Sequence, residues 1–351
     1  MKLPRKGLIR QMSRFLFFTD SHFSAHFTEF SNPDKDFINN RFRIQCNTLI
    51  KLLELAKDKS LPIIFGGDMF DIRNQIDIED FNHIYSIFSN YPEVKCYLLR
   101  GNHDSVNNLM GSPSSIDMFK CLPNKNVISN PEHIVIDHVD FYFMPYGENI
   151  PEIKSKLKEF AESARENDNS VLVAHLGVSG AKMNGIISKS KLMSNDFYPG
   201  IFNLVYLGHY HARQVFDKNH KNMFYGGSLF QNSFSDSGSH KGYDLIDINN
   251  GIFKDNFIKT NNPEFYTVFN WDEQAKKLVD QGNYVRLQTN DSKDVEQAQD
   301  NSNVRTELQK TFKINSRLDI KNNDSPLIIT KKYLDKNKID AFKEAKELLN
   351  S

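Results

Sequence analysis

The feature that most constrains the fold is a repeated unit, a short apolar run followed at once by a polar turn rich in Gly, Asp and His. Five such runs occupy residues 15–19, 61–65, 94–99, 171–174 and 204–207. Aliphatic or aromatic runs this short are typical of buried strands. Between them, apolar side chains recur at helical spacing. They are Cys46, Leu49, Ile50, Leu53 and Ala56 in one segment and Ile153, Leu157, Phe160, Ala161 and Ala164 in another.

Alternating strands and helices predict an α/β domain. Ligands of such sheets bind beyond the carboxyl ends of the strands, which is where all five polar turns lie. Further strand-like runs cover residues 141–144, 223–225, 243–248 and 253–258. The last three follow one another without helices between them, so they predict a second sheet with antiparallel character.

Residues Asn261, Asn262 and Pro263 interrupt this rhythm, and the rest of the chain has another pattern. The sequence therefore predicts an N-terminal extension at 1–13, a main domain at 14–262 and a small second domain at 263–351. In the second domain we expect strands at 265–271 and 284–288 and a helix from Val304. A loop at 321–325 and a last helix at 338–349 complete the expectation.

Composition adds a few limits. Lys plus Arg and Asp plus Glu both number 44, so the formal net charge is zero and any basic track for nucleic acid must be local. No apolar run approaches a membrane span, and the run at 15–18 is too short for the core of a signal peptide. The three cysteines are widely spaced, which favours reduced thiols. These features predict a cytoplasmic protein with no membrane partner.

The polar turns carry side chains that bind divalent metal ions. They are Asp20, His22, Asp68, Asp71, Asn102, His103, His175, His209 and His211. Oxygen and imidazole donors without thiolates suit Mn, Fe or Zn. Two divalent ions need one carboxylate between them and further ligands on each side. The set is large enough for two ions, with positions left for water and substrate.

Each motif alone is weak, but their order is specific. Asp20-x-His22, Gly67-Asp-x-x-Asp71, Gly101-Asn-His-Asp104, His175 and Gly208-His-x-His211 follow one another, each after an apolar run. Over residues 14–260 the chain resembles the calcineurin-like metallophosphoesterases. The resemblance implies a four-layer α/β/β/α sandwich with a small C-terminal α+β capping domain.

The resemblance also implies a role for each residue. One ion would be held by Asp20, His22, Asp68 and His211, and the other by Asp68, Asn102, His175 and His209, with Asp68 bridging. We expect Mn, with Mg, Fe or Zn as alternatives. His103 would steady the scissile phosphate and protonate the leaving oxygen, and the Asp71 carboxylate would orient His103. These two are the expected catalytic residues, whereas Asp104 is expected to organise its turn.

Other segments resemble the SbcD-type nuclease subunit, from the bacterial and phage branch of the double-strand-break repair nucleases. Phe70 in the second motif and the runs 225–234 and 241–247 carry this resemblance. It implies a homodimer that acts on DNA with an SbcC-type ABC ATPase in recombination and repair. The implied activities are Mn-dependent exonuclease action on duplex ends and endonuclease action on single strands or hairpins.

Several alternatives stay open. The competing functions are a phosphodiesterase or phosphatase for small nucleotides, and an adaptor that recruits an ATPase. The capping tail favours the nuclease over the small-nucleotide enzyme, and the complete ligand set disfavours the adaptor. The long insert at 23–43 would either shape the DNA entrance or a dimer contact, or be a solvated loop. The last helix would either contact the ATPase or be an ordinary packing helix. Arg213 is the best-placed basic residue for a phosphate, against an ordinary surface role.

Overall fold

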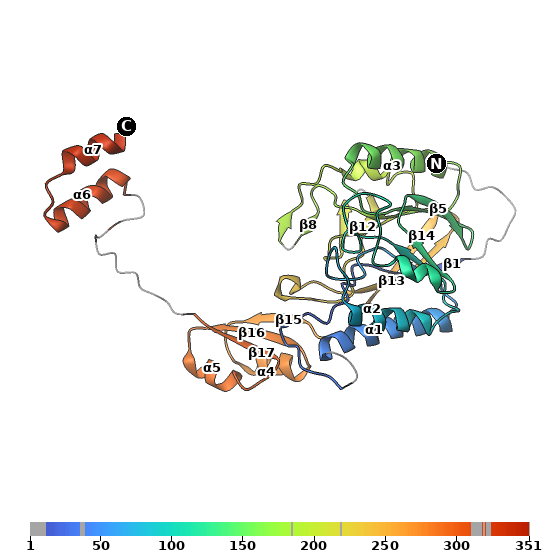
Figure 1. Ribbon diagram of the computed structural model, residues 1–351, viewed down its shortest axis with the longest axis horizontal. Helices are drawn as coiled ribbons and strands as arrows, with labels where there is room; N and C mark the ends of the chain where they lie inside the picture. Colours follow the sequence, from blue (N-terminus) through green and yellow to red (C-terminus); the bar gives the residue numbers. More distant parts are fainter. Residues whose placement is uncertain are drawn as a thin grey trace.

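The computed structural model describes residues 12–35, 39–183, 185–217, 220–309, 318, 320 and 324–350. A layered body carries most of the chain, a smaller unit lies beside it, and two C-terminal helices lie apart from both (Figure 1). The first eleven residues of the expected extension lie outside the described residues. Ser13, which was also assigned to the extension, is the first residue of strand β1 and pairs with Ile248.

The first sheet of the body has four parallel strands and an antiparallel pair. Its strands are β1 (Ser13–Phe18), β2 (Ile63–Phe65), β3 (Cys96–Leu99), β4 (Lys125–Ile128), β13 (Gly242–Asn249) and β14 (Ile252–Lys259), in the order β14-β13-β1-β2-β3-β4. Strands β1 to β4 are parallel, β13 is antiparallel to β1, and β14 is antiparallel to β13.

The second sheet has a similar plan. Its strands are β5 (Glu132–Ile136), β6 (Val139–Met144), β7 (Ser170–His175), β10 (Leu204–Gly208), β11 (Gln214–Asp217) and β12 (His220–Tyr225), in the order β11-β12-β10-β7-β6-β5. The expectation that 223–258 forms a second, antiparallel sheet was wrong. Strand β12 lies parallel to β10, whereas β13 and β14 extend the first sheet. Consecutive strands without helices between them were therefore divided between two sheets.

Helices cover the outer face of each sheet, so the body is an α/β/β/α sandwich (Figure 1). Helices α1 (Asn40–Asp58) and α2 (Ile78–Ser89) pack on the first sheet, and α3 (Ile150–Ala164) packs on the second. Phe42, Cys46 and Leu49 of α1 are fully buried, at the spacing that the sequence shows. Asn39 begins α1 because its side chain accepts a hydrogen bond from the backbone N–H of Phe42. The α/β expectation is confirmed.

A third core joins the two sheets. Its rings include Phe15 and Phe17 from β1 and Phe141 and Phe143 from β6, all fully buried. Phe15 and Phe141 meet edge to face with their ring centres 4.9 Å apart. Short elements complete the body. They are η1 (Asp117–Cys121), η2 (Ser194–Phe197), η3 (Phe234–Asp236), β8 (Lys182–Met183) and β9 (Ile186–Ile187).

The smaller unit is a parallel sheet with two helices. Its elements are β15 (Phe265–Val268), α4 (Glu273–Asp280), β16 (Tyr284–Thr289), α5 (Ser292–Ala298) and β17 (Val304–Leu308). The helix expected from Val304 was wrong, because this segment pairs with β16 from Val285 to Thr289. Helices α6 (Pro326–Asn337) and α7 (Phe342–Asn350) pack on each other. The expected last helix begins later than Lys338, since Lys338 ends α6 in a left-handed conformation.

The insert after His22 connects the body to the smaller unit. Its ring Phe30 stacks on Tyr284 with the ring centres 4.9 Å apart, and Glu29 pairs with Arg305 of β17. Arg41, at the start of α1, lies 5.2 Å from the centre of the Phe265 ring. The last residues of the expected insert, 40–43, belong to α1, and residues 36–38 lie outside the described part. Among the described helices, none has the length and apolar character needed to cross a bilayer.

Candidate metal centre

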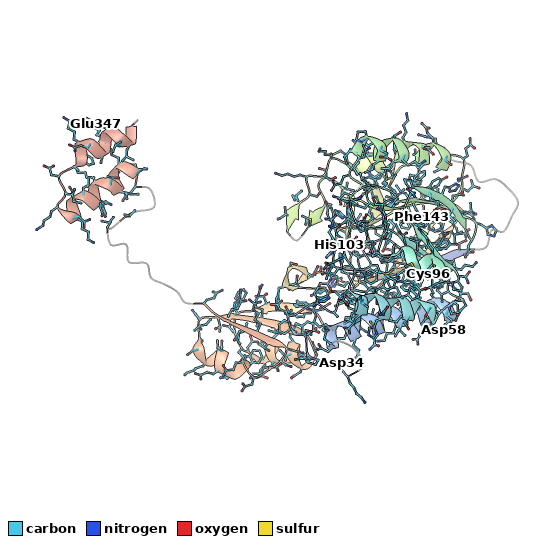
Figure 2. All side chains as sticks on the ribbon, in the orientation of Figure 1. Asp34, Asp58, Cys96, His103, Phe143 and Glu347 are labelled. Atoms are coloured by element: carbon cyan, nitrogen blue, oxygen red, sulfur yellow. The ribbon has the colours of Figure 1, made fainter. Side chains whose placement is uncertain are left out.

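Nine polar residues meet at the carboxyl ends of five strands. Asp20 and His22 follow β1, Asp68 and Asp71 follow β2, Asn102 and His103 follow β3, His175 ends β7, and His209 and His211 follow β10. Because β1, β2 and β3 are neighbours in one sheet and β7 and β10 in the other, the turns face one another across the sandwich. In Figure 2, His103 lies within the body, between the layer of α3 and the layer of α1. The structure brings all nine predicted residues together.

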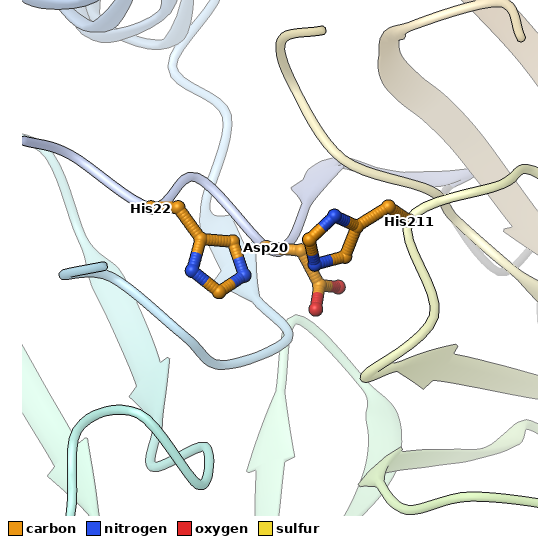
Figure 3. A group of neighbouring side chains, drawn as sticks. All are labelled: Asp20, His22 and His211. Carbon is orange, nitrogen blue, oxygen red and sulfur yellow. The ribbon is translucent and has the colours of Figure 1, made fainter. Parts of the chain in front are cut away.

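The first group of potential ligands consists of Asp20, His22 and His211. Their ligand atoms all lie within 4.8 Å of one another. Figure 3 shows the Asp20 carboxylate and the two imidazole rings turned toward a common space. His22 is 1% exposed. Its Nδ1 faces the Asp71 carboxylate at 3.4 Å, whereas its Nε2 lies 3.7 Å from Asp68 Oδ2 and makes no hydrogen bond within the described structure. A buried imidazole nitrogen without such a bond fits a metal ligand, because coordination would satisfy it.

The second group consists of Asp68, His175 and His209, also with ligand atoms within 4.8 Å. Asp68 Oδ2 lies 3.2 Å from His175 Nε2 and 3.7 Å from His22 Nε2, so this carboxylate lies between the two groups. Asn102 Oδ1 lies 3.1 Å from His175 Nε2 and 2.8 Å from His209 Nδ1. These clusters of Asp and His suggest a binuclear metal site, and their donors are those that borderline divalent ions prefer.

Four residues of the set have a left-handed backbone. The φ angles are 52° at Asp20, 44° at His22, 60° at Asp68 and 100° at His209. Such conformations cost roughly 1–3 kcal/mol each, and they cluster at functional sites. Hydrogen bonds between the turns hold them, for example from the His22 amide to the Asp68 carbonyl at 3.2 Å and from the His209 amide to Asp20 Oδ1 at 3.0 Å. The strain aims the side chains at one point instead of along the strands.

Two glycines allow the turns to approach so closely. A Cβ on Gly101 would lie 2.1 Å from Asp68 Oδ1, and one on Gly208 would lie 2.4 Å from the carbonyl oxygen of Gly66. The same Gly66 carbonyl lies 2.8 Å from His175 Nδ1. This contact would keep a proton on Nδ1 when a metal ion is bound, and it turns Nε2 toward the oxygens of Asp68 and Asn102, where a metal ligand is needed.

Charge is unevenly divided over the imidazoles. Burial would raise the pKa of Asp68, but His175 and His22 hold it well below its usual value. Burial likewise opposes the charge on His175, yet the Asp68 carboxylate raises its pKa to about 9. Burial and neighbouring imidazoles lower the pKa values of His209 and His211 to about 4. These last two are therefore neutral near pH 7, the form that binds metal.

Asp71 and His103 are neighbours, but not in the expected way. The expectation was that the Asp71 carboxylate orients His103. Instead, His103 Nδ1 contacts the backbone carbonyl oxygen of Asp71, while the Asp71 carboxylate lies 3.4 Å from His22 Nδ1. Asp71 thus orients His103 through its main chain and His22 through its side chain. Burial lowers the pKa of His103, which favours the neutral ring near pH 7.

Asp104 organises the turns, as expected from its position beside the motif. Its carboxylate accepts hydrogen bonds from the backbone amides of Asp68 at 3.0 Å, Met69 at 2.8 Å and Gly101 at 2.9 Å. Three backbone donors on one carboxylate tie the turns after β2 and β3 together. The ligand Asp68 and the neighbouring Asn102 are held in register by this bond set.

Lys241 supports the site from behind, and the sequence did not predict this role. It is 3% exposed, and its ammonium donates to the His211 carbonyl at 2.8 Å, Ser228 Oγ at 2.7 Å and Asp236 Oδ1 at 2.8 Å. Burial lowers the pKa of Lys241 although Asp236 opposes that shift. A single lysine before a strand has no pattern that reveals its burial.

Tyr146 is a second residue that the sequence did not assign to the site. It follows β6, whose carboxyl end lies beside that of β7, and its ring centre is 5.6 Å from that of His209. The rule that found the ligands, a polar residue after an apolar run, also applies to Tyr146 after the run at 141–144. This signal would have included it.

Arg213 does not face the site's phosphate position as a free cation. Its guanidinium pairs with Asp244 of β13 and Asp255 of β14, and its carbon Cζ lies 4.4 Å from the centre of the Phe257 ring. The idea that it contacts phosphate is therefore replaced by a packing role. It fixes the turn after His211 to the antiparallel pair of the first sheet.

Known proteins share parts of this chain. The family model described as Calcineurin-like phosphoesterase matches residues 13–213, more than half of the chain. Over 243 residues the chain is 27% identical to the SbcD subunit of the SbcCD nuclease of Staphylococcus saprophyticus, and the match covers 61% of this chain and 62% of that relative. The 5'-nucleotidase precursor from Thermus thermophilus aligns with a TM-score of 0.40 and 11% identity, over 71% of this chain and 55% of that one. The matched part of the curated relative is thus less than two thirds of its length.

Proposed function

Because the chain belongs to the calcineurin-like phosphoesterase family, we propose that it hydrolyses DNA phosphodiesters as a nuclease with two metal ions. The observation that carries the proposal is the pair of ligand groups with the Asp68 carboxylate between them. We assign Asp20, His22, Asp68 and His211 to one ion. We assign Asp68, Asn102, His175 and His209 to the other, and Mn is the metal that we propose.

The chain's own residues position the reaction. Two divalent ions, when bound, supply Lewis acidity and a hydroxide nucleophile at neutral pH. With Nδ1 of His103 donating to the Asp71 carbonyl, Nε2 is the nitrogen that remains for the substrate. His103 lies within the same cluster as His22 and Asp68, so it can exchange a proton with an oxygen of a phosphate bound there. Asp71 acts through His103 and His22 and is a positioning residue.

The choice of DNA rests on similarity to the SbcD subunit. The name of that relative describes a nuclease subunit. We therefore propose exonuclease action on duplex ends and endonuclease action on single strands. On the same similarity we propose a role in recombination and double-strand-break repair, and we propose the cytoplasm as its location, as the sequence predicts.

We propose further that the chain forms a homodimer and works with an ABC ATPase of the SbcC type. On this proposal, residues 14–262 are the catalytic domain and 263–351 a capping and partner-binding domain. The α6–α7 pair supports a partner contact because it exposes Ile328, Tyr333 and Leu348, the last at 77%. Light scattering of the purified chain measures its mass, and Leu348→Asp is expected to weaken binding to such an ATPase while dimer mass stays constant.

The test of the main proposal compares DNA with a small ester. The purified chain is incubated with Mn and a linear duplex, a single-stranded oligonucleotide or a small chromogenic phosphodiester. The wild type is expected to degrade both DNA substrates. The His103→Ala variant is expected to lose activity by 100-fold or more, in line with about 10²–10⁴-fold for loss of acid–base catalysis. His133→Ala, which alters a surface histidine paired with Asp140, is the matched control.

Two outcomes would contradict the proposal. Hydrolysis of the small ester alone, with DNA intact even when an SbcC-type ATPase is added, would assign the chain to small-nucleotide phosphodiesterases or phosphatases. No hydrolysis of any ester by a Mn-loaded chain would favour an adaptor whose role is to recruit an ATPase.

A further inference from the structure

A hollow of about 360 Å³ lies beside the candidate metal centre. Its lining includes His209, a proposed ligand, and Tyr146, whose ring centre lies 5.6 Å from that of His209. Further lining residues, Ser188, Ser190, Lys191 and Leu192, come from the segment between β7 and β10 that also carries the small β8–β9 pair. A group bound in the hollow would therefore sit next to the phosphate that the metal centre holds.

The hollow is lined by apolar and polar side chains together. On the apolar part, Leu176 and Leu192 are buried, Ile150 is half-buried at the start of α3, and Tyr146 presents a half-exposed ring. Tyr210 also lines the hollow, with its ring centre 4.8 Å from that of His209. Flat aromatic and aliphatic surfaces of this kind suit a planar ring and not a second phosphate.

A few polar groups are fixed around these walls. The hydroxyl groups of Ser188 and Tyr210 lie 2.6 Å apart, and Ser190 Oγ donates to the Gly177 carbonyl at 2.7 Å. Lys191 and Glu148, of opposite charge, are the exposed residues among those that line the hollow. A pocket with aromatic and aliphatic side chains and a few hydroxyl groups fits a heterocycle that is attached to a phosphate, with Lys191 as the cation available to that phosphate.

A second hollow, of about 230 Å³, includes His103 in its lining and shares no lining residue with the first. Its apolar side chains are Ile76, Val106 and Pro113, and among its described lining residues the imidazole of His103 is the one aromatic ring. Two hollows thus border the candidate metal centre, and of these the one beside His209 offers tyrosine rings. This difference identifies the hollow in which a base would be stacked.

We propose that the hollow lined by Tyr146 and Tyr210 binds the nucleobase of a nucleotide next to the scissile phosphate. The inference rests on the proposed nuclease function and adds a recognition site to it. Stacking of a base on an aromatic side chain contributes about 1–3 kcal/mol and accepts any of the four bases. Tyr146 would then favour nucleic acid over simple phosphodiesters without any preference for one base sequence.

The test removes the base and the tyrosine ring separately and together. The substrates are a single-stranded oligonucleotide and versions of it with one abasic nucleotide at successive positions around a cleaved bond. The variants are Tyr146→Leu and, as a control, Tyr85→Leu, which replaces a half-buried tyrosine on α2 that packs against Phe81 and Phe119. The quantity compared is kcat/KM with saturating Mn.

Removing one particular base is expected to lower kcat/KM of the wild type by roughly 5- to 160-fold, the range that corresponds to the stacking energy. Tyr146→Leu should show a similar loss on the intact oligonucleotide and no further loss when that base is absent, because both changes remove the same contact. Tyr85→Leu should keep the full sensitivity to the abasic nucleotide.

Two results would overturn the inference and are distinguishable from each other. If the oligonucleotide is cleaved but the losses from the abasic nucleotide and from Tyr146→Leu multiply, or if no base removal has an effect, the hollow does not bind a base. If the wild type cleaves no oligonucleotide but hydrolyses the small phosphodiester, the nuclease proposal fails and the base site fails with it.

Discussion

The buried ion pair behind the turn of His211 allows a quantitative prediction. Replacing Lys241 by Met removes an ammonium that donates to the His211 carbonyl, Ser228 and Asp236. The His211 carbonyl keeps a hydrogen bond from the Ser228 amide at 3.0 Å, so it is not left without a donor. Asp236 is 5% exposed and loses its counter-ion. The main cost is therefore an uncompensated buried carboxylate.

Removal of one partner from a buried pair costs about 3–5 kcal/mol, whereas replacement of both can be nearly neutral. Lys241→Met is thus expected to lower the free energy of unfolding of the phosphoesterase domain by roughly 4 kcal/mol. The double variant Lys241→Met with Asp236→Asn should regain more than half of this loss. Mn affinity of the single variant should fall about tenfold or more, because Lys241 holds the turn of a proposed ligand.

Urea unfolding followed by circular dichroism measures the first effect, and Mn titration calorimetry measures the second. Lys276→Met, which breaks an exposed pair with Glu273, is the matched control and should change stability by less than about 1 kcal/mol. A loss below about 1 kcal/mol for Lys241→Met, or a double variant no more stable than the single one, would refute the reasoning.

Three further predictions follow from the same structure. Gly101→Ala would place a Cβ 2.1 Å from Asp68 Oδ1 and should reduce Mn affinity by about 10- to 100-fold in calorimetry, whereas Gly200→Ala, with no atom within 4 Å, should not. Burial raises the pKa of Asp80 to about 6, so the folded chain keeps a proton that the unfolded chain loses between pH 4 and 6. The free energy of unfolding, measured in urea with EDTA, should therefore fall for the wild type relative to Asp80→Asn by up to about 3 kcal/mol as pH rises through this window. Parallel curves of unfolding free energy against pH for the two proteins would contradict this prediction. Phe30→Ala removes the ring stacked on Tyr284. The change should lower the free energy of unfolding by roughly 2 kcal/mol and speed proteolysis between the body and the β15–β17 unit. An unchanged rate of cleavage would contradict the inference that Phe30 holds the two together.

Nine strands of the two large sheets could be predicted because each contains a short apolar run next to a polar turn. Strands β4, β5 and β11 were not predicted, and four of the five residues of β5, for example, are not buried. Helix α2 was not predicted, since few of its residues are fully buried, among them Ile84 and Phe88. The segment at Val304 was assigned to a helix because so short a run has no decisive period. This segment is a strand because it pairs with β16, and the local sequence does not predict that contact.

The site residues could be located because the chemistry lies at strand ends, but the roles of individual atoms could not. A sequence does not say whether the carboxylate or the carbonyl of Asp71 faces His103, and the structure shows the carbonyl. Arg213 stands two residues after His211, which suggested a phosphate contact. Its actual partners, Asp244 and Asp255, come from strands that join the first sheet only through long-range pairing.

Each ligand group contains residues from both sheets, so the packing between the sheets also affects the geometry of the candidate metal centre. Asp20 and His22 approach from the first sheet and His211 from the second, while Asp68 faces His175 and His209 in the same way. The aromatic layer between the sheets, in which Phe141 contacts Phe15, Phe17 and Phe143, therefore sets the distance between the two halves of each ligand group. A change of ring size in that layer would therefore alter which metal ion the site prefers, although none of the ligand residues is replaced.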